Sequence, residues 1–190
     1  MNASGQRDDE RTTELALAAA RGDRAAFEAW VRRTQADVWR FLVHLNGSQT
    51  ADDLTQETYL RAVTALPRFA GRSSSRTWLL SIARRVYVDS VRRETVRPRS
   101  SHQEWEDVAE QLPTTGDDGS TGFEAAVDTQ LLLDQLEPER REALVLTQIL
   151  GYSYAEAAEV CDCPVGTLRS RIARAREDLL VALRQQHHAS

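Results

Sequence analysis

The chain has 190 residues, of which 41% are hydrophobic and 28% are charged, and its formal net charge is −5. This length suits one ordinary domain or two small ones, and no apolar run approaches the roughly 18 residues that a membrane span needs. The N-terminus is polar and acidic, unlike a signal peptide, and two cysteines do not make a disulfide framework, so we expect a cytoplasmic protein without membrane association.

Charge is unevenly distributed along the chain. Residues 61–99 carry 10 arginines against 2 acidic residues, whereas residues 100–139 carry 11 acidic residues and no arginine. A local basic block is an electrostatic sign of nucleic-acid binding even in an acidic chain. Because this block also contains Phe69, Trp78 and Tyr87, we favour nucleic-acid binding over the alternative of a solvated helix face.

The first half of the chain is predicted to be helical. Apolar residues recur at helical spacing in four stretches, which are separated by Gly-Asp, Asn-Gly-Ser and Pro breaks. The approximate ranges of these helices are 12–21, 26–45, 51–66 and 76–97. They define a first domain over residues 12–97, which follows a disordered N-terminus over residues 1–11.

Periodicity is lost after residue 97. The segment 98–122 is rich in Ser, Thr, Gly and Asp, which predicts a flexible acidic linker. Helical patterns resume in a second domain over residues 123–190, where Pro138 suits the first turn of one helix and Gly151 ends it. With no strand pattern anywhere, the expected fold class is all-α, with two small helical domains on a tether.

A helix-turn-helix is predicted near the C-terminus. Ser153 and Glu156 form a capping box that starts a short helix, and Cys-Asp-Cys-Pro at residues 161–164 provides a turn before a second helix. The second helix of this motif enters the DNA major groove.

The faces of that second helix follow from a turn of about 100° per residue. Its apolar side chains fall in one sector, and they are Val165, Leu168, Ile172, Ala175 and Leu179. The opposite side is small and polar with flanking arginines, so it can approach base edges and reach phosphates. The candidate DNA contacts are Thr167, Arg169, Ser170, Arg171, Arg174 and Arg176. A solvated amphipathic helix remains the alternative.

The cysteine pair Cys161 and Cys163 raises the possibility of metal or redox chemistry. A structural zinc site needs about four ligands, and a redox pair usually has the spacing C-x-x-C, and neither pattern is present. We therefore expect a turn, with no metal, no cofactor and no catalytic residue.

Three segments in order resemble bacterial RNA polymerase sigma factors of the extracytoplasmic-function type, which are group 4 of the sigma-70 family. They are ADDLTQETYLRAV at 51–63, FAGRSSSRTWLLSIARRVYVDSVRR at 69–93 and GYSYAEAAEVCDCPVGTLRSRIARARE at 151–177. The resemblance implies a non-enzymatic protein that binds core RNA polymerase and directs promoter-specific initiation by reading −10 and −35 elements.

The resemblance also implies where partners bind. The 51–63 helix would dock on the clamp coiled coil of the polymerase through Asp52, Asp53, Gln56, Glu57 and Leu60. The 69–93 segment would melt the promoter and read the −10 element, and single-strand binding needs both stacking surfaces and charge. Its candidate residues are Phe69, Arg72, Ser73, Ser74, Arg76, Arg84, Arg85, Arg92 and Arg93. Trp78 is better explained as core. The polymerase flap and an anti-sigma factor are further possible partners, and the second domain would read the −35 element of promoter DNA.

Two other functions stay open on the sequence alone. A stand-alone helix-turn-helix regulator with a helical sensing domain explains residues 151–177 but not the pattern over 51–93. An enzyme that uses the cysteine pair or the carboxylates at 52–57 lacks a nucleophile–base set and a phosphate-cradling glycine loop.

Overall fold

The computed structural model describes residues 3–96 and 129–189, and every regular element in these ranges is a helix. The elements of the first half are α1 (Ala3–Ala20), α2 (Arg24–Asn46), α3 (Ser48–Ala65), the 3₁₀ turn η1 (Leu66–Arg68) and α4 (Ser75–Val96). Those of the second half are a helical turn at 129–134, α6 (Pro138–Leu144), the π-helical turn η2 (Val145–Ile149), α7 (Tyr154–Val160) and α8 (Val165–Ala189).

The helices of the first half pack as a bundle around Trp30. This side chain is fully buried on α2, and the rings of Phe27, Tyr59 and Trp78 surround it with centroids 6.0 to 6.2 Å away. Its indole N–H donates to Ser75 Oγ at 3.1 Å, so the polar edge of the ring is satisfied inside the core. The expectation that Trp78 belongs to the core is confirmed by these contacts.

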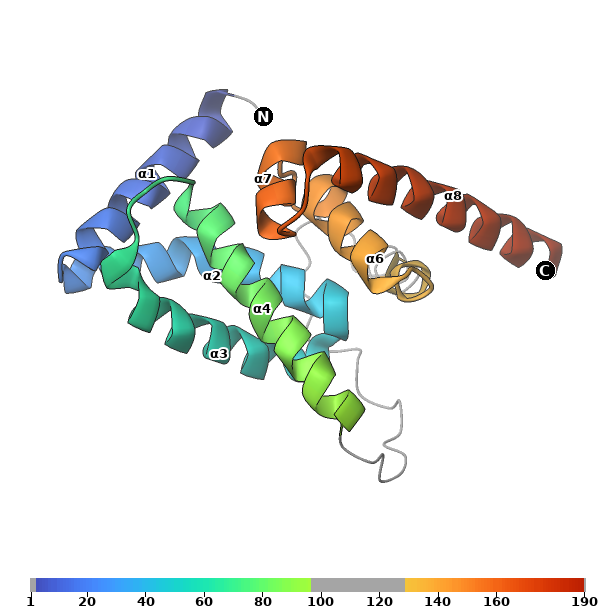
Figure 1. Ribbon diagram of the computed structural model, residues 1–190, viewed down its shortest axis with the longest axis horizontal. Helices are drawn as coiled ribbons and strands as arrows, with labels where there is room; N and C mark the ends of the chain where they lie inside the picture. Colours follow the sequence, from blue (N-terminus) through green and yellow to red (C-terminus); the bar gives the residue numbers. More distant parts are fainter. Residues whose placement is uncertain (1–2, 97–128, 190) are drawn as a thin grey trace, which may run out of the picture.

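The apolar stripe predicted for the third helix is confirmed. Its members are all buried in α3 and η1, and they are Ala51, Leu54, Thr58, Ala62 and Leu66. Gly47, with φ of 81°, separates α2 from α3 and donates its N–H to the Val43 carbonyl. The tight connection makes α2 and α3 neighbours, as Figure 1 shows.

The N-terminal helix begins earlier than predicted, so disorder over residues 1–11 is wrong for the described part of that segment. α1 starts at Ala3. Asp8 accepts a hydrogen bond from Arg33 Nη1 at 2.6 Å and lies 3.6 Å from Arg76 Nη1. An acidic side chain of this segment is therefore used in ion pairs with arginines of α2 and α4. The predicted linker over 98–122, and with it the domain boundaries, lies outside the described residues.

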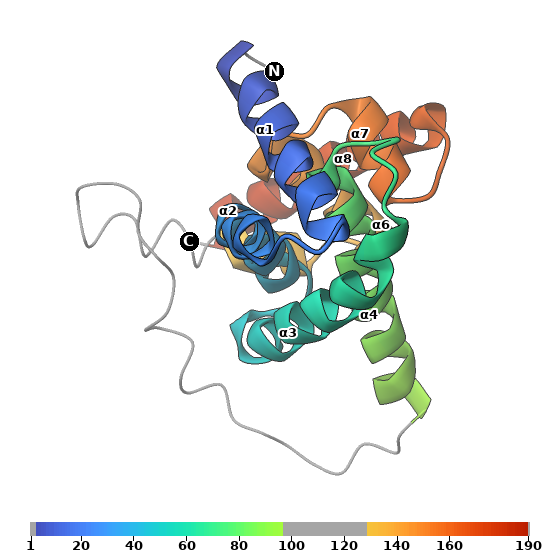
Figure 2. The same ribbon diagram turned by 90° about the vertical axis from the view of Figure 1, so that its left-hand side faces the viewer.

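The two halves pack against each other rather than standing apart. Their buried apolar side chains form one continuous cluster, and α4 contacts α7 while α2 contacts α6 (Figures 1 and 2). Polar contacts join them as well: Arg141 Nη1 donates to the Leu45 carbonyl at 3.2 Å, and His44 Nδ1 lies 3.1 Å from Gln130 Oε1. The C-terminal part of α8 extends away from this junction (Figure 1). Among the described helices, none combines the length and the apolar character of a membrane span.

Candidate nucleic-acid interface

The predicted helix-turn-helix is present as α7, a short turn and α8. Its capping box is confirmed, because Glu156 N–H donates to Ser153 Oγ and the Glu156 carboxylate accepts from the Ser153 N–H at 2.8 Å. The turn ends α7 with a Schellman motif. Asp162 has φ of 51°, its N–H donates to the Glu159 carbonyl, and the next N–H donates to the Ala158 carbonyl. This motif sets where α8 starts and how it is directed.

α8 presents the two faces that its sequence predicts. Leu168, Ile172 and Ala175 are buried against the rest of the second half, which fixes the rotation of the helix. The side away from this contact is open and carries four of the candidate DNA contacts, Thr167, Arg169, Ser170 and Arg174. Small polar side chains at the centre of an exposed face allow close approach to base edges.

The other two candidate arginines of α8 are bound within the second half. Arg171 has a side chain only 19% exposed, and its Nη2 donates to Glu139 at 2.9 Å. Its Nη1 is buried and has no hydrogen-bond partner among the residues that the structure describes. Arg176 Nη2 donates to Gln148 at 3.2 Å. Arg171 therefore links α8 to α6 as well as lying beside the exposed face.

The cysteines belong to the turn. Cys161 is 2% exposed and packs in the core, and burial raises the pKa of its thiol, so the reactive thiolate is disfavoured. Cys163 is half-buried against the same cluster. In the part of the chain that the structure describes, no group of three or more His, Cys, Asp or Glu side chains is arranged to hold a metal ion.

The loop before α4 supplies fewer exposed groups than predicted. Phe69 is 8% exposed, and its ring lies 4.8 Å from that of Trp78, so in this arrangement the ring packs in the core and its contact with DNA stays a prediction. The aromatic ring follows η1 directly and closes the core of the bundle. Ser74 Oγ accepts from the Thr77 N–H at 3.2 Å and so caps α4. Arg72 is exposed and Ser73 half-buried, which leaves them accessible on the loop.

The arginines of α4 divide into two groups. Arg85, Arg92 and Arg93 are exposed along the helix. Arg76 and Arg84 are instead held by carboxylates: Arg76 Nη2 donates to Asp37 of α2, and Arg84 Nε donates to Glu142 of α6, each at 2.5 Å. In this arrangement the guanidinium of Arg84 is bound to a carboxylate of the second half of the molecule.

The predicted polymerase face of α3 is exposed, as expected from the buried stripe on its other side. Asp53 and Gln56 point to solvent, and Leu60 is 66% exposed. Asp52 accepts a hydrogen bond from the Trp39 indole at 2.8 Å. Glu57 pairs with Arg61 at 2.7 Å, and the same arginine reaches Asp89 of α4.

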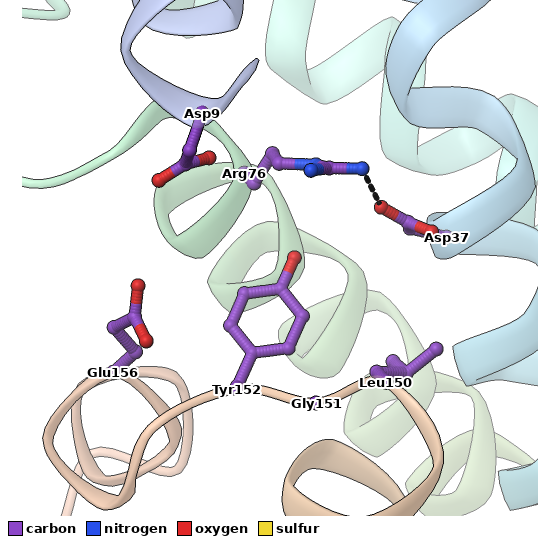
Figure 3. Close-up of a pocket in the computed structure, with 7 residues that line it drawn as sticks. All are labelled: Asp9, Asp37, Arg76, Leu150, Gly151, Tyr152 and Glu156. Atoms are coloured by element: carbon purple, nitrogen blue, oxygen red, sulfur yellow. Dashed lines mark hydrogen bonds and ion pairs between the residues drawn. The ribbon is translucent and has the colours of Figure 1, made fainter. Parts of the chain in front are cut away.

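A polar pocket lies between the two halves (Figure 3). Its lining residues are Asp9, Asp37, Arg76, Leu150, Gly151, Tyr152 and Glu156. Three buried atoms of the described residues here lack a hydrogen-bond partner: Asp9 Oδ1, Arg76 Nε and the Tyr152 hydroxyl. Burial raises the pKa of Asp9, and it also raises that of Tyr152. A mixed set of donors and acceptors suits ordered water better than a metal.

Sequence reasoning missed the residues that join the halves. Glu142, Tyr152 and His44 gain their roles from the packing of the second half on the first bundle, which no local pattern encodes. The sequence offers a signal for Glu142, because this residue directly precedes the apolar run Ala143–Leu146. The structure shows that Glu142 is buried.

The described elements are all helical. The first half is a bundle with a buried core and a basic helix α4, and the second half exposes a helix-turn-helix that carries arginines. These features define a DNA-binding protein in two parts that acts in transcription. Two family models match it: "Sigma-70 region 2" over residues 30–97 and "Sigma-70, region 4" over residues 127–179. The chain belongs to the sigma-70 family, in its extracytoplasmic-function group, and is a sigma factor that directs promoter-specific transcription initiation. The alternative of a stand-alone regulator is not favoured, because both regions match.

Curated relatives cover nearly the whole chain. The ECF RNA polymerase sigma factor SigC of Mycobacterium tuberculosis is 52% identical over 91% of this chain and 91% of its own length, and the probable sigma-C factor of Mycobacterium bovis gives the same values. The factor EcfG of Rhodopseudomonas palustris is 35% identical over 75% of this chain and 77% of its own.

Solved structures share the fold. CnrH in complex with the cytosolic domain of CnrY superposes with a TM-score of 0.71 at 26% identity, covering 92% of this chain and 98% of that one. The sigma factor RpoE of Bartonella quintana, in complex with the anti-sigma factor NepR, gives a TM-score of 0.66 at 25% identity over 83% of this chain and 96% of that one.

Proposed function

We propose that this sigma factor reads the −35 element with the exposed face of α8 and the −10 element with α4 and the loop before it. The observation that carries the proposal is the pattern of exposure on α8. Thr167, Ser170 and Arg174 form an open polar face, while the apolar side chains of the same helix are buried. A second helix held in this way by a helix-turn-helix is oriented for the major groove.

On the −10 side, the proposal rests on the charge of α4 and its exposed arginines. Arg72 of the preceding loop and Arg85, Arg92 and Arg93 of α4 provide exposed cationic groups, as a single-stranded or melted DNA backbone requires. The ring of Phe69 is buried in this arrangement, so its contact with DNA stays a prediction.

Core RNA polymerase is the proposed partner of α3. Its outer face combines the carboxylates Asp52, Asp53 and Glu57 with the exposed side chain of Leu60, a combination that suits a basic partner surface with an apolar spot. The clamp coiled coil is the expected contact, and the polymerase flap is expected to take the second half. The family implies these contacts, and it also implies a protein without enzymatic activity or a cofactor. We propose a cytoplasmic location for it.

An anti-sigma factor is a further proposed partner. Support comes from the RpoE structure of Bartonella quintana, which resembles this chain and holds the anti-sigma factor NepR. Such a partner would bind the polymerase-facing surfaces and so compete with transcription.

Run-off transcription with core polymerase tests the −35 assignment. Replacing Arg174 with Ala removes an exposed cation from the proposed recognition face, and the loss of one base or phosphate contact of about 1–3 kcal/mol corresponds to a fall of roughly 5- to 150-fold in transcript. Arg24→Ala is the matched control, because its side chain is 92% exposed on α2, far from this face in sequence. Equal transcription from both variants would contradict the assignment.

A gel shift without polymerase separates the two candidate functions. The chain is acidic overall, and phosphate attraction dominates affinity for duplex DNA, so we expect weak binding by the free protein. Tight and specific binding without polymerase would instead support a stand-alone regulator.

A further inference from the structure

Glu142 is a buried carboxylate that lies at the junction of the two halves. Its residue is 4% exposed on α6, and it accepts a hydrogen bond from Arg84 Nε of α4. Arg84 is itself only 22% exposed in its side chain. Burial raises the pKa of Glu142, and the charge of Arg84 opposes this shift. A buried carboxylate is strongly destabilising when it loses its partner, so this pair favours the packed arrangement.

A second arginine binds the same helix three residues before this carboxylate. Arg171 of α8 donates to Glu139 at 2.9 Å, and Glu139 and Glu142 are i, i+3 neighbours on α6. The charge of Arg171, like that of Arg84, opposes the rise in the pKa of Glu142. One nitrogen of this guanidinium, Nη2, is bound to Glu139, but Nη1 is buried and has no hydrogen-bond partner in the described structure. A guanidinium has five N–H donors, and a buried donor without an acceptor is costly. Arg171 therefore holds a free donor near a carboxylate that Arg84 already occupies.

We infer that Glu142 is a latch that exchanges Arg84 for Arg171 when the two halves separate. In the packed form, Glu142 binds Arg84 and keeps this arginine of α4 away from DNA. When the halves part, Arg84 is released, and Glu142 accepts a hydrogen bond from Nη1 of Arg171 within the second half. Arg171 then bridges Glu139 and Glu142, both on α6, which ties α8 to α6 more firmly.

The inference rests on the proposed function for the meaning of Arg84 and α8. We propose that α4 reads the −10 element and α8 the −35 element. Separation of the halves would then release Arg84 of α4 for DNA and hold α8 more firmly against α6. The exchange itself is a property of the isolated chain. It can therefore be tested without polymerase or promoter DNA, so its failure and a failure of the proposed function would be distinguished.

The latch is tested by the separation of the halves in the full chain. Genetically encoded fluorophores at the exposed positions Thr64 of α3 and Glu177 of α8 report their distance by energy transfer. Replacing Arg84 with Gln removes one charge-assisted hydrogen bond, which should raise the ratio of open to packed molecules about tenfold or more. The neighbouring exposed Arg85, replaced by Gln, is the control and should leave the ratio unchanged. An unchanged ratio in Arg84→Gln would overturn the latch.

The exchange is tested by a double-mutant cycle between Glu142 and Arg171. Glu142→Gln and Arg171→Gln are measured singly and together by urea unfolding, with Arg84 present and again with Arg84→Gln. The coupling factor should grow roughly two- to tenfold once Arg84 is absent, because Arg171 then becomes the partner. Arg171→Lys, which keeps the charge, should retain part of the coupling if the Gln variant unfolds. Equal coupling in both backgrounds would overturn the exchange.

Discussion

The indole N–H of Trp30 is a buried polar group with a defined partner in the first bundle. It donates to Ser75 Oγ, and both residues are fully buried. Replacing Ser75 with Ala leaves this donor unpaired, which we expect to lower the free energy of unfolding by about 1–3 kcal/mol in urea titrations. Ser73→Ala, on the half-buried loop nearby, should change it little. Similar losses in both variants would argue against a special role for the Trp30 bond.

We expect His44, which contacts Gln130 of the second half, to make the packing of the two halves sensitive to pH. Burial lowers its pKa, the charge of Arg40 lowers it further, and Gln130 opposes the shift. Because the folded protein binds fewer protons at this site than the unfolded chain, its contribution to stability is present above about pH 6.5 and is lost as the pH falls below that value. His44→Asn should flatten this dependence in thermal unfolding between pH 7.5 and 5.5. If the difference in melting temperature between the wild type and His44→Asn is the same at every pH, His44 is not the source of the pH dependence.

At the scale of residues, the spacing of apolar side chains predicts which residues are buried. The type of a side chain predicts less well which groups it contacts. The periodicity of α8 correctly separates Leu168 and Ile172 from Ser170. The burial of Phe69 is not predicted, because an aromatic ring suits base stacking and core packing equally well. Arg171 is assigned to DNA from its place beside the polar face of its helix and Arg84 from the resemblance of its segment, and the carboxylates that hold them come from distant parts of the chain.

At the scale of elements, the turn between α7 and α8 sets the direction of α8, the helix that we propose reads the −35 element. Asp162 adopts a left-handed conformation, with φ of 51°, which costs roughly 1–2 kcal/mol for most residues and little for glycine. Asp162→Gly should therefore keep or raise the melting temperature, while Asp162→Val should lower it and reduce transcription. The two variants are matched for the loss of the carboxylate, so equal melting temperatures would contradict the role of the backbone conformation.

The helices themselves are largely predictable, and their deviations have physical causes. The starts of α4 and α7 follow from capping residues in the sequence. The π-helical turn at Val145–Ile149 is not predicted, since its apolar residues continue the pattern of α6 without any break. The early start of α1 is missed because its stabilising partners, Arg33 and Arg76, lie on other helices.

At the scale of the whole molecule, the sequence predicts two tethered domains but not their packing. A handful of long-range contacts decides it, including Arg84–Glu142 and Arg141 to the Leu45 carbonyl, and these have no local signature. The packed chain brings the two proposed DNA-reading surfaces onto one compact body (Figure 2). The two promoter elements are separated along the DNA. The two surfaces can bind them at the same time only if the distance and orientation between the surfaces match those of the elements.

Site-specific photocrosslinking tests the central claim most directly. A photoreactive residue replaces Ser170 at the centre of the exposed face of α8 or Ser73 in the loop before α4, in the complete complex of sigma factor, core polymerase and promoter DNA. We expect position 170 to crosslink to the −35 duplex and position 73 to the −10 region, each only when core polymerase is present. Crosslinks from position 170 outside the −35 element, or equal crosslinks without polymerase, would contradict the account.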